Sequence, residues 1–182
     1  MALEFTTSYL TDALAVFRAY KKLGDGAIAQ VTDEQLTVVL DAEMNSIAQI
    51  VKHMAGNMRS RWTDFLTTDG EKPDRERETE FVAPPASRSG ILTLWDAGWQ
   101  LVFAALDPLS DDDLARVVQI RGERHSVMQA INRQMTHYAY HVGQIVLLAK
   151  HFRGSAWRSL SIPRGASTRY EAQVRAGEAS QR

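Results

Sequence analysis

The sequence predicts an all-α fold, a four-helix bundle with a long crossover between the second and third helices. Four segments of about 20 residues place apolar side chains at helical steps of three and four, a length typical of bundle helices. A charged segment with glycine and prolines separates the second from the third, and no segment alternates as a strand would. The 182 residues suit one domain, which we expect to comprise the bundle over residues 1–154 and a C-terminal loop and tail over residues 155–182.

Two helices are predicted in the N-terminal part of the chain. Apolar side chains fall at helical spacing between about residue 3 and residue 30, but Gly24-Asp25-Gly26 interrupts them, so we expect the first helix to end near Leu23. Residues 31–36 form a polar, turn-like stretch. Asn45-Ser46 then offers cap residues for a second helix that reaches roughly Phe65.

The crossover and the third helix follow. Residues 67–89 combine glycine, prolines and many charges, which indicates neither a helix nor a core strand. Ser87 or Ser89 can cap a third helix that runs to about Leu106. The first and third connections are therefore short, and the middle one is long.

The fourth helix has the most regular apolar row of the chain. Ser126 can cap it, and Gly154 is the residue type that commonly ends a helix, so we expect the helix to fill the interval between them. The tail over residues 156–182 is expected to be extended or looped, with its last dozen residues mobile.

The composition limits the partners, the location and the metal ligands that we expect. The formal net charge is −1 without clustered Lys and Arg, so we expect neither nucleic acid nor an anionic membrane as a partner. No apolar run approaches the roughly 20 residues that span a bilayer, and the N-terminus lacks a signal-peptide pattern, so we expect a soluble cytoplasmic protein. Cysteine is absent, so any metal site must use nitrogen and oxygen ligands.

Three histidines form the candidate metal site. His137 and His141 lie four residues apart in the fourth helix, so both project from one face about one turn apart. His53 lies in a matching polar row of the second helix. Three imidazoles would leave coordination positions open for Lewis-acid chemistry, and Asn57 and Gln144, one turn away, could hold water or orient an imidazole.

Other interpretations stay open for these and neighbouring residues. Two histidines at this spacing also occur as an exposed or hydrogen-bonded pair without a metal. His125 and His151 lie too far along the chain to join the site. The charged segment 70–77 is interpreted as a solvated loop, although Arg75 and Arg77 could meet an anionic substrate. Large aromatic residues at helical positions usually serve packing, which we expect for Trp62, Trp95, Trp99 and Trp157.

With His53 and His137-x-x-x-His141 in such a bundle, the chain resembles the DinB/YfiT-like superfamily of proposed metalloenzymes. The segments 45–58, 61–72 and 160–165 resemble a branch known only as a domain of unknown function. The resemblance implies a divalent metal, often nickel or zinc, held by the three histidines, and commonly a homodimer. It also implies activation of a low-molecular-weight thiol, such as bacillithiol or mycothiol, which would come from outside because this chain has no cysteine.

Two functions follow as hypotheses. The first is a metal-dependent enzyme of thiol-transferase or hydrolase type, in which a cation stabilises the nucleophilic thiolate or hydroxide. The alternative is a non-catalytic helical binding or stress-response protein, dimeric, with a structural metal or none. An all-imidazole site accepts several divalent metals, and neither a general base nor another catalytic residue is assigned.

Overall fold

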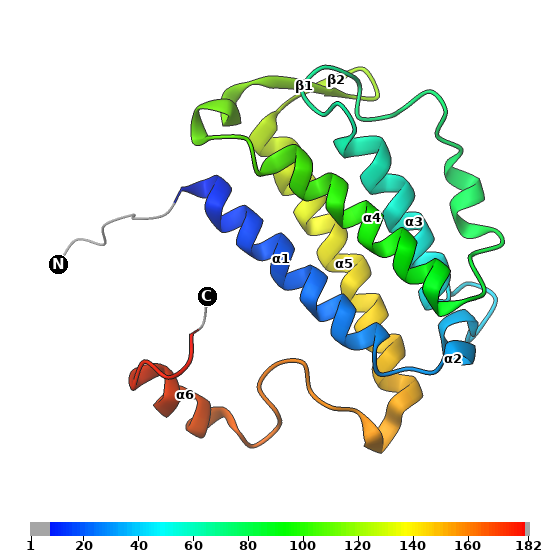
Figure 1. Ribbon diagram of the computed structural model, residues 1–182, viewed down its shortest axis with the longest axis vertical. Coiled ribbons are helices and arrows are strands. Elements are labelled where there is room, and N and C mark those ends of the chain that lie inside the picture. Colours follow the sequence, from blue (N-terminus) through cyan, green and yellow to red (C-terminus); the bar gives the residue numbers. More distant parts are fainter. Residues whose placement is uncertain (1–7, 181–182) are drawn as a thin grey trace.

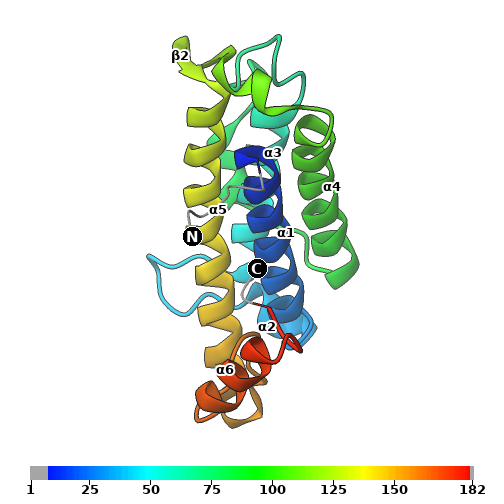
Figure 2. The same cartoon turned by 90° about the vertical axis from the view of Figure 1, so that its left-hand side faces the viewer.

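The computed structural model describes residues 8–180, which are mostly helical with one small two-stranded sheet (Figure 1). The four long helices are α1 (Tyr9–Ile28), α3 (Ile47–Trp62), α4 (Arg88–Leu106) and α5 (Val127–Arg153). They lie side by side in a ring, in which α3 packs against α4 and α5, and α1 packs against α4 and α5 (Figures 1 and 2). The predicted helical class is thereby confirmed, and each long helix corresponds to a predicted one.

The long crossover follows from the directions of the helices. α3 and α4 run the same way along the bundle, and α1 and α5 run the opposite way (Figure 1). Two neighbouring helices that run in the same direction cannot be joined by a tight turn, because the chain must first return along the whole length of the bundle. Residues 63–87 make this return. They contain the 3₁₀ helix η1 (Arg77–Phe81), which packs against α3.

The predicted helix starts are confirmed where serine was expected as a cap. The hydroxyl oxygens of Ser46, Ser87 and Ser126 accept backbone N–H groups at the starts of α3, α4 and α5. At Ser46 and Ser126 a glutamine three residues later also bonds back to the cap, which satisfies two otherwise unpaired donors. The predicted C-terminal end of α5 at Gly154 is confirmed too, with a positive φ of 50° at that glycine.

Two predicted helix ends are wrong. α1 continues through Gly24 to Ile28. Gly24 faces the indole of Trp95, and a Cβ atom there would overlap that ring. The glycine therefore permits close helix packing and does not end the helix. α3 ends at Trp62, before Phe65, where the chain turns through the positive φ of Asp64. The expected start of α1 near residue 3 lies outside the described residues.

Two short helices replace segments predicted as turn or loop. α2 (Asp33–Thr37) forms within the polar stretch, because Thr32 and Gln35 make a capping box. α6 (Ser167–Arg175) forms in the tail, in a stretch free of the glycine and proline that break helices. Two further 3₁₀ turns, η2 (Asp111–Ala115) and η3 (Gly154–Ala156), follow the ends of α4 and α5.

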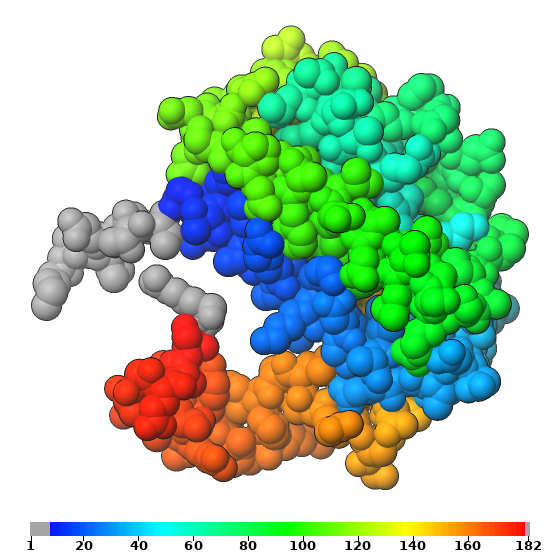
Figure 3. All heavy atoms as spheres, in the orientation of Figure 1, coloured from blue at the N-terminus to red at the C-terminus, as the bar shows by residue number. Residues whose placement is uncertain are grey.

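The tail turns back from the end of α5 towards α1. Leu160 packs on Gly26, and Gln30 exchanges two hydrogen bonds with the backbone of Arg158. Beyond these contacts α6 lies across an open space from the bundle (Figure 3). None of the described helices is long and apolar enough to cross a membrane.

A β-hairpin, which the sequence pattern did not predict, covers one end of the bundle. β1 (Val117–Ile120) and β2 (Glu123–Ser126) pair antiparallel around a turn at Arg121-Gly122, both with positive φ. Each strand has only four residues and β2 is wholly polar, so no alternation stands out in the sequence. Ser126 is both the last residue of β2 and the cap of α5.

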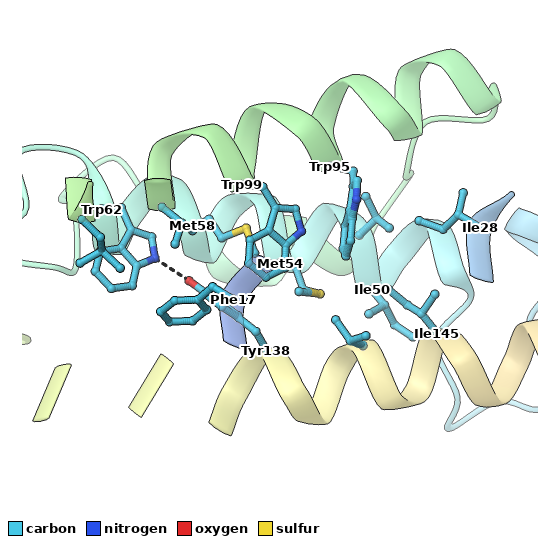
Figure 4. Packing of buried hydrophobic residues seen from close by; sticks show 14 of the residues in the cluster. Phe17, Ile28, Ile50, Met54, Met58, Trp62, Trp95, Trp99, Tyr138 and Ile145 are labelled. Carbon is cyan, nitrogen blue, oxygen red and sulfur yellow. Dashed lines mark hydrogen bonds between the residues drawn. The ribbon is translucent and has the colours of Figure 1, made fainter. Parts of the chain in front are cut away.

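Aromatic side chains fill the centre of the bundle (Figure 4). Trp62, Trp95 and Trp99 are buried, and Trp157 packs half-buried against the same cluster, which confirms the predicted packing role of the tryptophans. The indole N–H of Trp62 donates to the hydroxyl of Tyr138 at 2.9 Å, which satisfies a buried donor and ties α3 to α5. These are the two helices that carry the candidate site.

Candidate metal centre

The three predicted histidines meet between α3 and α5. His53 comes from α3, and His137 and His141 come from neighbouring turns of α5. One nitrogen from each ring lies within 4.8 Å of the others, and the Nε2 atoms of His137 and His141 are 3.1 Å apart. This group could hold a metal ion. As expected, His125 and His151 do not belong to it.

A buried carboxylate orients His53. The Nδ1 atom of His53 lies 2.8 Å from Oε2 of Glu80, and the two side chains are only 5% and 8% exposed. Gly56 permits this approach, because a Cβ atom at that position would overlap the Glu80 carboxylate. Phe81 stacks on the imidazole with the ring centroids 4.7 Å apart. The ring is thus held in place from the crossover side.

Glu80 is itself fixed by Arg75, whose Nε and Nη2 atoms donate to the two carboxylate oxygens at 2.8 and 3.0 Å. Burial raises the pKa of Glu80, but the hydrogen bonds from His53 and Arg75 outweigh it and leave the pKa below its usual value. The carboxylate is therefore ionised and accepts a hydrogen bond from the Nδ1–H group of His53. The lone pair of His53 is then on Nε2, the ring nitrogen that Glu80 does not engage.

Gln144 orients His141 in the same manner. Its side-chain oxygen lies 2.8 Å from Nδ1 of His141, and because that oxygen only accepts, Nδ1 carries the proton and Nε2 carries the lone pair. This is the orienting role predicted for Gln144. The side-chain oxygen of Asn57 accepts hydrogen bonds from Gln134 and Tyr138, each at 3.2 Å, and from no imidazole among the described residues; its role in holding water stays a prediction.

The protonation of the α5 histidines suits a ligand role. Burial, reinforced by the neighbouring histidines, lowers the pKa of His137 to about 3. Burial also lowers the pKa of His141 to about 4. Both rings are therefore neutral near pH 7, and neutral imidazole is the form that binds metals. The Nδ1 atom of His137 is buried without a hydrogen-bond partner among the described residues.

The histidines lie in a polar cavity of about 630 Å³. Among the lining residues that the structure describes, none is Asp or Glu. Five are arginines contributed by α3, the crossover, the hairpin turn and α5, namely Arg61, Arg75, Arg77, Arg121 and Arg133.

The crossover segment 70–77 is only partly the solvated loop that the sequence predicts. Arg77 is exposed, but the side chain of Arg75 is 3% exposed and binds Glu71 and Glu80. The interpretation as a solvated loop is therefore wrong for Arg75. Sequence reasoning also missed Glu80 and Arg121, because no local pattern shows that the crossover folds onto His53 or that a hairpin turn reaches the cavity.

The chain matches a known protein family, but no activity is assigned to that family. A family described as "Protein of unknown function (DUF1572)" matches residues 4–166. No curated protein and no solved structure matches the chain. Because the match covers well over half of the sequence, the chain belongs to the DUF1572 family.

Proposed function

We propose that the protein binds a divalent metal ion through the Nε2 atoms of His53, His137 and His141. We further propose that it works as a metal-dependent enzyme of thiol-transferase or hydrolase type. The observation that carries the proposal is the convergence of three imidazoles, two of them with the far nitrogen held by an oxygen acceptor. Such outer hydrogen bonds are usual for histidines that bind metals.

The spacing of the donor atoms suits a metal ion. Metal–nitrogen bonds of about 2.0–2.1 Å place two ligand nitrogens about 3 Å apart in tetrahedral or octahedral geometry. The Nε2 atoms of His137 and His141 are 3.1 Å apart. A ligand nitrogen of His53 lies within 4.8 Å of the other two, so the side chains of His137 and His141 would turn towards His53 when a metal binds.

The residues around the site favour a substrate whose reacting group loses its proton easily. A bound divalent ion would lower the pKa of a thiol or water in an open coordination position. No carboxylate lines the described cavity, and Glu80 is engaged by His53 and Arg75, so no side chain stands ready as a strong base. A thiol, with an ordinary pKa near 8.5, needs the least help to ionise. It would be an external thiol, because the chain has no cysteine.

The resemblance to the DinB/YfiT-like superfamily supports the same proposal. It favours nickel or zinc as the metal and a homodimer as the assembly. Apolar side chains that stay exposed on one loop and on α5 offer a surface for such a dimer, namely Val38, Val39, Leu40, Met44, Tyr140 and Leu147. Light scattering during gel filtration would show whether the mass is that of one chain or two.

Elemental analysis of protein purified without an affinity tag tests metal binding. We expect about one divalent ion per chain in the wild type and none in His53→Ala or in His137→Ala/His141→Ala. The matched control is His151→Ala, which removes an exposed histidine from the same helix and should leave the metal content unchanged. A wild type that neither contains nor takes up metal at neutral pH would refute the proposal.

Activity is tested separately with the reconstituted protein. We expect turnover with a low-molecular-weight thiol and an electrophile, or with an ester or amide substrate, and loss of turnover on chelation. If the protein holds one metal ion per chain but turns over no substrate in either panel, the metal is structural. That result would refute the proposed enzymatic activity but not the proposed metal binding.

One observation favours the second candidate, a non-catalytic helical protein without a metal. The 3.1 Å contact between the Nε2 atoms of His137 and His141 can also be a hydrogen bond between two neutral imidazoles, in which His137 donates. In that case His53→Ala would change no metal content, and metal addition would not shift the unfolding temperature.

A further inference from the structure

The histidines belong to two rows of polar side chains, one on α3 and one on α5, and each row ends in an arginine. On α3 the row is His53, Asn57 and Arg61, in steps of four residues. On α5 it is His141, His137 and Arg133, also in steps of four. α3 and α5 run in opposite directions, so both rows lead from the histidines towards the hairpin end of the bundle (Figure 1). Each step is about 6 Å along a helix axis.

The arginines at this end outnumber their carboxylate partners. Glu71 accepts from Arg61 at 3.0 Å, from Arg75 at 3.3 Å and from Arg121 at 3.0 Å. Glu80 accepts from Arg75 and from His53. Three guanidinium groups thus share these two carboxylates, and a third carboxylate, that of Asp69, accepts the backbone N–H of Arg121. The excess positive charge at the cavity is therefore that of Arg133.

Arg133 and Arg61 have N–H groups that no described acceptor pairs with. Arg133 is exposed on α5 and forms no ion pair within residues 8–180. The side chain of Arg61 is 5% exposed, and its Nε atom is buried without a hydrogen-bond partner among the described residues. An unpaired buried donor costs free energy unless a ligand or water satisfies it. Both residues line the cavity.

The hairpin turn presents Arg121 in a backbone conformation that arginine rarely adopts. Its φ is +57°, a region that favours glycine or asparagine, and a bulkier residue there costs roughly 1 kcal/mol. Asp69 holds the turn by accepting the backbone N–H groups of Arg121 at 2.8 Å and Gly122 at 2.7 Å. A residue kept in a strained position beside a cavity points to a role for its side chain.

We propose that the cavity binds an anionic substrate whose carboxylate or phosphate group lies among Arg133, Arg121 and Arg61. The reacting end of the substrate then lies at the three histidines, about one to two helical turns away, or roughly 6–12 Å. Arginine suits this role because its planar donors bind carboxylate or phosphate oxygens in pairs. The substrate assignment rests on the proposed function, whereas anion binding itself requires no metal.

Calorimetric titration of the metal-free full chain tests the anion site. The probes are inorganic phosphate and succinate, each at matched ionic strength in chloride buffer, so that the two arms distinguish phosphate from carboxylate recognition. We expect saturable binding of at least one probe. Arg133→Gln should weaken it about tenfold, the loss of one charge-assisted hydrogen bond.

Two further variants distinguish binding in the cavity from non-specific attraction of anions to surface arginines. Arg124→Gln removes an exposed arginine that does not line the cavity, and it should keep wild-type affinity. Arg121→Asn removes the guanidinium but keeps a residue that tolerates positive φ, so the turn should persist while affinity falls. Circular dichroism of each variant checks that the fold is intact.

The outcomes separate this inference from the metal proposal. Neither probe binding saturably, or Arg133→Gln and Arg124→Gln weakening binding equally, would overturn the anion site whatever the metal content. Arginine-dependent binding by a chain that takes up no metal would support the anion site and refute only the metal-dependent reaction. The arginine variants should also retain the metal content of the wild type.

Discussion

His53 and Glu80 lie 27 residues apart in the chain, yet their side chains meet at 2.8 Å in a buried position. The contact joins α3 to η1, so the crossover is part of the site and not only a link between helices. It also decides which nitrogen of His53 is free, because the carboxylate accepts a hydrogen bond from the N–H group of the other one.

Glu80→Gln should weaken metal binding about 10–100-fold, because the amide cannot hold His53 and Arg75 as the ionised carboxylate does. Competition with a chelating dye measures the affinity. Glu78→Gln is the matched control, since that side chain is 87% exposed two residues earlier in the same 3₁₀ helix. Equal affinities for the two variants would contradict the role of Glu80.

The metal-free protein should lose stability as the pH falls from about 6.5 to 5. The pKa values of His137 and His141 are lowered to about 3 and about 4, so in this range the unfolded chain takes up protons that the folded chain does not. Each such histidine adds a slope of at most about 1.4 kcal/mol per pH unit, and the contribution vanishes above the unfolded value near 6.5.

Urea unfolding at several pH values checks this dependence. The double variant His137→Gln/His141→Gln should show a flatter profile between pH 5 and 6.5. An unchanged slope in the double variant would mean that other groups cause it. Carboxylates add their own dependence only below about pH 4.5, which keeps the two effects apart.

Gly24→Ala should lower the free energy of unfolding by about 1–3 kcal/mol, because the added methyl group would overlap the indole of Trp95. Gly143→Ala is the control in α5, where a Cβ atom meets nothing within 4 Å. There the better helix propensity of alanine should raise the free energy of unfolding by up to about 1 kcal/mol. Changes of the same sign in both variants would argue against the close packing of α1 and α4.

Asp69→Ala should release the hairpin turn from the crossover. The variant loses three backbone N–H groups as donors to the carboxylate, those of Glu71, Arg121 and Gly122. We expect a loss of about 2 kcal/mol in stability and faster amide exchange at Arg121 and Gly122. Hydrogen-exchange mass spectrometry measures both amides, and Asp112→Ala, at an exposed position, should leave them unchanged.

Local signals explain what the sequence predicts correctly. The start of α5 at Ser126 and its end at Gly154 depend on capping groups within a few residues, so they can be recognised without knowledge of the fold. The pairing of His137 with His141 is likewise a matter of helical spacing. His53 joins them because polar rows on two amphipathic helices face the same side of the core.

Non-local contacts explain what it misses. Nothing near Gly24 in the sequence shows that Trp95 will lie against it, so the local pattern predicts a helix end there. Glu80 is one of many charged residues in the crossover, and only folding onto α3 distinguishes it. The polar strand β2 forms by pairing with β1, which no period of its own residues could indicate.

Ser126 is the last residue of β2 and the cap of α5, so no flexible joint separates the strand that follows Arg121 from the helix that carries Arg133 and the two histidines. The strand pairing with β1 fixes the chain before Ser126, and the hydrogen bonds of α5 fix the chain after it. The backbone positions of Arg121 in the turn and of Arg133 and the two histidines in α5 are therefore fixed relative to one another. A ligand that spans them would lose little affinity to the entropy of ordering the protein.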